Sequence, residues 1–299
     1  MSKQDILAAH RLEKTSQNSF DLLFDVAARM AASEQKELSL LDVGSYVGSF
    51  ARGAISKLND HPLSIYCFDA FQGNIETAKS LISEPFVEFI NAAVTKEDLS
   101  EVTFSIPKQS FSDDHQNTWG GRVATDPTRQ EFSQDEKIRV PGIALDTFLK
   151  QRNIERPDIV KMDIQGGEYE ALLGMGAALR QTKLMFIECQ LKHGRDMRYV
   201  ELLQKNGFIV MMDTFQFGMH PDLNDEEVRM ICDMVGIRIE RMVGRNVYGS
   251  STRGDFFLKC LSHRSPISGM FTYFQTDLLA ANMRFGLAKI ALYEALTTA

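Results

Sequence analysis

The chain has 299 residues, 44% of them hydrophobic and 24% charged, and its formal net charge is −7. These values are typical of a globular protein with a full core, and an acidic chain without a basic stripe argues against nucleic-acid binding. The N-terminus lacks the apolar region of a signal peptide, and no run reaches the ~18 apolar residues of a membrane span, so we expect a cytoplasmic protein. The four cysteines show no CxxC spacing, so we predict neither disulfides nor a metal site.

Amphipathic spacing predicts one or two helices over residues 5–32. We interpret the short apolar runs that follow as seven strands, at 38–44, 64–70, 87–94, 158–164, 184–190, 208–214 and 255–260. Helical segments separate most of the first five strands, at 48–58, 73–82, 143–152 and 168–180. Apolar strands that alternate with helices indicate a parallel sheet covered on both faces. We therefore predict an α/β protein with a Rossmann-like, doubly wound, mostly parallel seven-stranded sheet.

Three stretches fall outside this pattern. Residues 103–140 form a long polar connection, which is either a substrate lid around Trp119 or a disordered segment. A helix capped near Asn224 is predicted between the last two strands, because Glu227 follows three residues later. The tail 268–299 shows helical apolar spacing and would pack on the body or on a second subunit, which makes a homodimer reasonable. The expected parts are a helical segment (1–36), a Rossmann-like domain (37–262) and a C-terminal helical extension (263–299).

The first motif that could carry chemistry is "LLDVGSYVGSF", in which a strand meets Gly44 and Gly48 as a helix opens. Glycine permits a tight turn and lets the backbone come close to a ligand. The spacing is GxxxG and not the GxGxxG that seats a pyrophosphate on a helix N-terminus. The motif therefore favours a nucleoside ligand without a pyrophosphate, with an ordinary strand-to-helix turn as the alternative.

The next strand supports the nucleoside interpretation, because "IYCFDA" ends in Asp69, 25 residues after Gly44. An acid at this position can accept hydrogen bonds from both ribose hydroxyls, although it could also cap a turn. Asn91 and Ala92 follow near the end of the third strand, where an adenine could stack.

Together, "LLDVGSYVGSF", "CFDA", "NAAV", "IALDTFL", "DIVKMDIQGGEYEALLGM" and "MFIECQ" resemble the FkbM family of S-adenosylmethionine-dependent methyltransferases, from about residue 38 to residue 260. The most specific segment is 159–175, which resembles the family's K-x-D-x-E-G-x-E pattern. Gln165 stands where the family usually carries Glu, and Asp69 replaces a more usual Glu. Asp69 keeps the ribose-binding chemistry, whereas Gln165 removes a third carboxylate.

The resemblance implies methyl transfer from S-adenosylmethionine (SAM) to a hydroxyl of a small molecule or sugar. By position, Gly44 and Gly48 would hold the methionine moiety of SAM, Asp69 its ribose, and Asn91 with Ala92 its adenine. Asp163 would lie beside the sulfonium or the amino-acid end. The candidate cofactor-binding residues are Asp42, Gly44, Tyr46, Gly48, Asp69, Ala70, Asn91, Ala92 and Asp163.

A hydroxyl acceptor must lose its proton, which calls for a base or a metal-bound alkoxide. The candidate catalytic residues are Asp163, Glu188 and His193, with His115 on the long connection. Glu188 interrupts an apolar strand and could equally pair with a cation. Glu168 lies in the first turn of a helix, where a negative charge is favourable, so we interpret it as a helix cap.

Two other functions remain open. A nicotinamide-dependent oxidoreductase would share the strand, glycine and acid, but the chain lacks GxGxxG and a Tyr-x-x-x-Lys pair after the fourth strand. A non-catalytic scaffold that binds the cofactor is kept open by Gln165.

Overall fold

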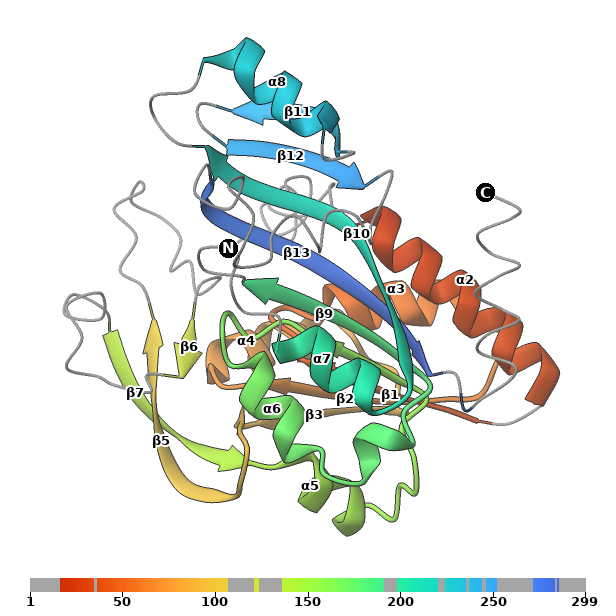
Figure 1. Cartoon of the computed structure of the whole chain (residues 1–299). Helices are drawn as coiled ribbons and strands as arrows, with labels where there is room; N and C mark the ends of the chain where they lie inside the picture. Colours follow the sequence, from red (N-terminus) through yellow and green to blue (C-terminus); the bar gives the residue numbers. More distant parts are fainter. Residues whose placement is uncertain are drawn as a thin grey trace.

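A computed structural model describes residues 17–34, 37–106, 121–123, 136–190, 198–219, 224–234, 237–243, 246–251, 271–282 and 284. These residues build two sheets (Figure 1). The large sheet has nine strands in the order β11-β12-β10-β13-β9-β8-β1-β2-β3, and the small sheet has four in the order β4-β7-β5-β6. The prediction of a seven-stranded sheet therefore accounts for only part of the large sheet.

The large sheet consists of β1 (Leu38–Val43), β2 (Leu63–Asp69), β3 (Val87–Asn91), β8 (Ile159–Met162), β9 (Leu184–Gln190), β10 (Phe208–Met219), β11 (Ile237–Val243), β12 (Asn246–Ser251) and β13 (Phe271–Asn282). The small sheet consists of β4 (Ala93–Val94), β5 (Leu99–Ile106), β6 (Arg122–Val123) and β7 (Glu136–Ile143). The helices are α2 (Gln17–Glu34), α3 (Ser49–Lys57), α4 (Gln72–Leu81), α5 (Leu145–Gln151), α6 (Glu168–Gly174), the short η3 (Ala178–Arg180), α7 (Arg198–Lys205) and α8 (Asp225–Met234).

The first five predicted strands are present, and their central part is parallel. β1 pairs with β2 on one side and with β8 on the other, and β3 and β9 extend the parallel sheet outward. The strand order therefore reverses beside β1. In doubly wound sheets a ligand binds at the carboxyl ends of the strands where the order reverses. The predicted Rossmann-like α/β fold is confirmed, and its topology points to the end of β1.

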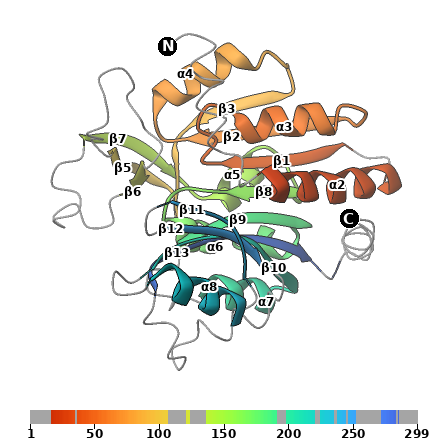
Figure 2. The ribbon, with the colours of Figure 1, turned by 90° about the horizontal axis from the view of Figure 1, so that it is seen from above.

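Alternate residues of the central strands pack on opposite faces. Leu40, Ile159 and Leu184 belong to one core, which α2 and α3 cover. Their chain neighbours Leu41, Val160 and Met185 belong to the second core, which includes residues of α5, α6 and α7. Strands buried on both faces must be apolar at nearly every position, which is the pattern that the sequence shows. Figures 1 and 2 show the two helix layers on either side of the sheet.

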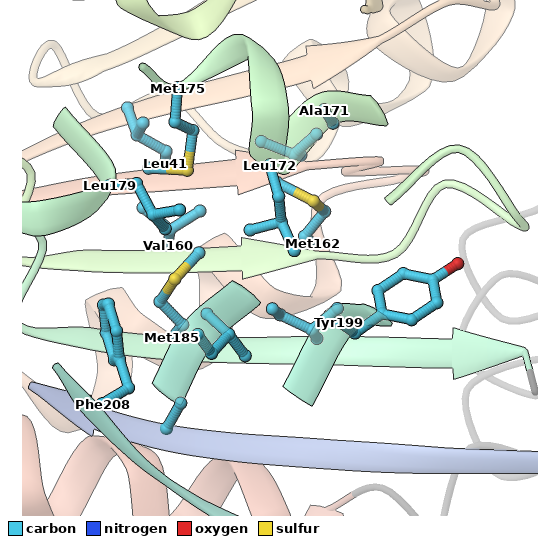
Figure 3. Close-up of a cluster of buried hydrophobic side chains, with 14 of the residues drawn as sticks. Leu41, Val160, Met162, Ala171, Leu172, Met175, Leu179, Met185, Tyr199 and Phe208 are labelled. Atoms are coloured by element: carbon cyan, nitrogen blue, oxygen red, sulfur yellow. The ribbon is translucent and has the colours of Figure 1, made fainter. Parts of the chain in front are cut away.

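Figure 3 shows the second core at the centre of the sheet. Side chains of β1, β8 and β9 meet the inner faces of α6 and η3, and Tyr199 and Phe208 close the cluster toward α7 and β10. Leu41, Val160, Met162, Leu172, Met175 and Met185 are completely buried. This packing holds the ends of β1 and β8 side by side, and these ends carry the predicted site.

The C-terminal helical prediction is wrong for residues 271–282. They form β13, which runs antiparallel between β9 and β10. The sequence "FTYFQTDLLAAN" has apolar residues at both helical and strand spacing, and periodicity alone does not separate a buried strand from a helix. The predicted strand at 255–260 lies outside the described residues, and β11 and β12 were not predicted.

The polar connection at 103–140 contains strands. Its first residues belong to β5 and its last to β7, with β6 between them, while 107–120 and 124–135 lie outside the described residues. In β7 the inward Ile138, Val140 and Gly142 alternate with exposed residues. This period of two is typical of a strand with one face exposed to solvent. The high polar content of the region hid the pattern in the sequence.

Two smaller predictions concern the ends of helices and the membrane. The capped helix near Asn224 is confirmed, because its Oδ1 accepts from the backbone N–H of Glu226 and Glu227. Glu227 in turn accepts from the backbone N–H of Asn224, which completes a capping box. Within the described part of the chain, no helix is both long and apolar enough to cross a bilayer.

Candidate functional site

A pocket opens at the carboxyl ends of the parallel strands and is also lined by residues of the small sheet. It encloses about 1050 Å³ of space, part of which is open solvent. Its lining comes from the ends of β1, β2, β8 and β9 and from β4, β5 and β6. The lining residues are Gly44, Ser45, Tyr46, Ser49, Phe50, Phe68, Asp69, Ala70, Ala92, Ala93, Val94, Phe104, Gly121, Val123, Lys161, Asp163, Ile164, Gln165, Phe186 and Glu188.

Gly44 lies where three strand ends meet. Its φ of +78° belongs to the left-handed region, and a Cβ atom there would stand 1.8 Å from the carbonyl oxygen of Asp163. The backbone N–H groups of Gly44 and Ser45 both donate to the carbonyl of Phe68 at 2.9 Å. Only glycine lets the turn after β1 lie this close to the end of β8. Gly48 also has a positive φ, but it precedes α3 beside Ile82 and is not among the lining residues.

Asp69 fixes the turn after β1 from the neighbouring strand. Its carboxylate accepts from the backbone N–H of Tyr46 at 2.9 Å and of Phe71 at 2.8 Å, and from the side-chain amide of Asn74 at 3.0 Å. Burial raises the pKa of Asp69 to about 6, although these donors oppose the rise. Asp69 is therefore mostly ionised at neutral pH, and its edge on the pocket can accept further hydrogen bonds.

The small sheet supplies an apolar wall. Ala92 and Val94 reach the pocket from the end of β3 and from β4, and Phe104 and Val123 reach it from β5 and β6. Asn91 ends β3 as expected but is not among the residues that line the pocket. Its amide donates to the carbonyls of Asp69 and Ala70 at 3.0 Å each, so it braces the turn after β2 from behind.

Lys161 lies beneath the glycine turn, and the sequence prediction did not include it. Its ammonium donates to the carbonyl of Gly44 at 2.5 Å and stands 3.2 Å from the carboxylate of Asp42, and both side chains are buried. Burial alone would lower the pKa of Lys161, but the carboxylates of Asp42, Asp163 and Glu188 raise it above its ordinary value. Asp42 thus acts through Lys161 and is not among the lining residues.

The turn between β8 and α6 is held by Glu168, which is completely buried. Its carboxylate accepts from the backbone N–H of Ile164 and of Gly166, at 3.0 Å each. The expected capping role is therefore more specific, because Glu168 folds back onto the turn that precedes its own helix. Burial raises the pKa of Glu168 to about 7 despite these donors.

Residues 42–210 match the Methyltransferase FkbM domain. The chain belongs to the FkbM methyltransferase family. No curated protein matches the chain. Among solved structures, a methyltransferase FkbM from Methylobacillus flagellatus KT is 13% identical, with 59% of this chain and 40% of that chain covered and a TM-score of 0.39. A SAM-dependent methyltransferase from Agrobacterium tumefaciens is 10% identical, with 89% and 61% covered and a TM-score of 0.40. A precorrin-6y C5,15-methyltransferase from Geobacter metallireducens GS-15 is 10% identical, with 86% and 88% covered and a TM-score of 0.36.

In this FkbM-family chain the pocket brings together seven of the predicted site residues: Gly44, Tyr46, Asp69, Ala70, Ala92, Asp163 and Glu188. Asp42, Gly48 and Asn91 support the turns around it. His193, His115 and Trp119 lie outside the described residues. In the part of the chain that the structure describes, no cluster of histidine, cysteine and acidic residues could hold a metal ion.

The sequence prediction did not include four polar residues that line the pocket: Ser45, Ser49, Lys161 and Gln165. Two of these, Lys161 and Gln165, flank Asp163. Both lie within the segment that resembles the family pattern, at spacings of two along the strand and turn from Asp163. Because side chains two residues apart in a strand share a face, Lys161 could have been placed beside the site from that spacing.

Proposed function

We propose that this chain binds SAM in the pocket at the carboxyl end of β1 and methylates a hydroxyl group of a small molecule or sugar. The observation that carries the proposal is the meeting of the Gly44 turn, Asp69 and Asp163 in one pocket of a family member. Family membership supports methyl transfer, and the chemistry of the lining side chains supports an oxygen acceptor.

The pocket residues fit SAM. Asp69 offers carboxylate lone pairs to the ribose hydroxyls. Ala92, Val94 and Phe104 form an apolar wall suited to an adenine ring. Asp163 offers a carboxylate to the ammonium group of the amino-acid end, and it lies beside the Gly44 turn. When bound, SAM supplies an activated methyl group.

The remaining work falls to the side chains of the chain itself. They must orient the acceptor and take the proton that its hydroxyl loses. Asp163 and Glu188 line the same pocket, and each can accept a proton from a hydroxyl placed beside it. The apolar residues of the small sheet reduce the access of water to that proton transfer. We assign Glu188 as the base and Asp163 to the cofactor, because Asp163 is next to the glycine turn.

The test is a calorimetric titration of the purified chain with SAM, S-adenosylhomocysteine (SAH) and NADH. We expect binding of SAM and SAH and none of NADH. Binding of NADH alone would contradict the methyltransferase proposal and favour an oxidoreductase. Binding of SAH without turnover on any hydroxyl acceptor, in a panel of sugars and small alcohols, would favour the scaffold.

Asp69 gives this test a pH dependence. Ribose hydroxyls donate to the ionised carboxylate, so affinity for SAH should fall as pH drops below about 6, by up to tenfold per unit. Asp69→Asn should weaken binding at pH 8 and flatten this profile. Asp98→Asn is the matched control, because Asp98 also accepts a backbone N–H, from Ala144 at 2.9 Å, but lies outside the pocket lining. Equal effects of the two substitutions would refute the role of Asp69.

A further inference from the structure

A glutamine joins the two carboxylates at the pocket. The side-chain Nε2 of Gln165 donates to Asp163 Oδ1 at 2.8 Å and to Glu188 Oε1 at 3.1 Å. Asp163 follows β8 and Glu188 lies in β9, and these strands are parallel neighbours. All three side chains line the pocket. The bridge therefore joins two strand ends at the place where an acceptor would react.

The bridge is held in a strained turn. Gln165 has a φ of +58°, which a long side chain seldom adopts, and Gly166 follows with a φ of +111°. Such a conformation is strained and persists where its surroundings impose it. Here Glu168 imposes it, because its buried carboxylate binds the backbone N–H groups on both sides of Gln165. The amide is thus aimed by the fold at the two acids.

The chemistry of an amide explains why this bridge is stable. A glutamine NH₂ group has two N–H donors, so it can satisfy one oxygen of each carboxylate at once. The reverse orientation would place the amide oxygen against two carboxylate oxygens, which repel it. A glutamate at position 165 would bring a third carboxylate to the same point. Three carboxylates at such distances are stable only with a shared proton or a bound cation.

We propose that Gln165 is a positioning residue that holds Asp163 and Glu188 side by side, with its amide donating to both carboxylates in place of a shared proton or a cation. This inference rests on the proposed function for its consequence. Two carboxylates held side by side favour a cationic or hydrogen-bond-donating ligand and disfavour an anionic one. The acceptor class is accordingly a neutral or cationic hydroxyl compound, and not a phosphorylated one.

The other charged groups near the pair come from the elements packed around it. Lys161 on β8 is paired with Asp42 on β1, Asp69 on β2 lines the same pocket, and Glu168 on α6 binds the turn. Asp277 of β13 is in backbone register with Glu188. Asp69 and Glu168 titrate near neutral pH themselves. Only differences between variants and the wild type, measured at each pH, therefore report on the bridge.

The experiment measures the thermal midpoint, Tm, of the chain without cofactor from pH 5.5 to 8. Gln165→Glu keeps the shape and adds the third carboxylate, whose folded-state pKa must lie above its unfolded value. Its stability relative to wild type is then present at low pH and lost as pH rises through the raised pKa. Because this loss begins above the unfolded pKa of about 4.3, we expect its Tm to lie closer to wild type at pH 5.5 than at pH 8, where it should be about 3 °C or more below wild type.

Two further variants make the result specific. The double variant Gln165→Glu with Glu188→Gln restores two carboxylates and one amide, so it should recover most of the loss at pH 8. Gln72→Glu is the matched control, because Gln72 also donates to a carboxylate, that of Glu76 at 3.2 Å, but in an exposed pair. We expect no pH-dependent gap for it.

A gap of Gln165→Glu that is absent, or that is equal at pH 5.5 and 8, would overturn the proposal, as would a double variant that recovers nothing. The measurement needs no cofactor. Its failure is therefore distinct from a failure of wild type to bind SAH, which would refute the proposed function and leave the bridge in place.

Discussion

Replacing Gly44 by alanine tests whether the close approach of two strand ends builds the pocket. The new Cβ would stand 1.8 Å from the carbonyl oxygen of Asp163 and 2.8 Å from its carbonyl carbon, at a φ of +78°. The left-handed conformation costs an alanine about 1–2 kcal/mol, and overpacking against backbone costs about 1–3 kcal/mol more. We therefore expect a loss of about 2–5 kcal/mol in the free energy of unfolding, a large share of the ~5–15 kcal/mol that a domain has.

The assay is urea unfolding followed by fluorescence or circular dichroism, with Gly166→Ala as the matched control. Gly166 also has a positive φ, of +111°, but nothing lies within 4 Å of its added Cβ. The control therefore carries backbone strain without the clash, and Gly44→Ala should cost about 1–3 kcal/mol more. Equal losses for the two variants would refute the argument, because strain alone would then account for both.

Three more substitutions probe the buried charges. Lys161→Met leaves Asp42 buried without its cation, so it should cost about 3–5 kcal/mol in urea unfolding and also weaken SAH binding. Lys183→Met breaks the buried pair of Lys183 with Asp158, whose charged atoms are 2.7 Å apart at the opposite ends of the strands. It should cost as much stability but leave SAH affinity unchanged. Loss of SAH binding in both variants would contradict the role of Lys161 at the pocket. Burial raises the pKa of Glu168 from 4.5 to about 7, so wild type loses stability as pH rises from about 4.5 to about 7. Glu168→Gln should show a flatter dependence of Tm between about pH 5 and about pH 7, and an unchanged profile would contradict that shift.

The sequence predicted the fold well where strands are buried on both faces. Near-continuous apolar runs, as in 159–162 and 184–187, leave few alternatives to a parallel sheet with helices on either side. It failed for β13, because that strand is paired with β9 and β10, which are distant along the chain. Local spacing carries no information about such partners, and an apolar run without them is as consistent with a helix.

The site was predicted only in part, because local sequence shows where strands end but not which side chains face a ligand. Glycines and acids at the ends of strands indicate a ligand site, and Gly44, Asp69 and Asp163 do line one pocket. Which side chain faces the ligand depends on contacts that sequence does not give. The carboxylate of Asp42 pairs with Lys161, and the side-chain amide of Asn91 donates to backbone carbonyls. These residues support the pocket from behind it.

Hydrogen–deuterium exchange with and without SAH is the most direct test of where the cofactor binds. We expect slower exchange of backbone amides in 44–49, 69–71, 92–94 and 161–168, which surround the pocket. We expect no change near 156–158 and 181–184, at the opposite ends of the strands. If saturating SAH leaves the first four segments unprotected, or protects only the two segments at the opposite ends of the strands, SAH does not bind in this pocket.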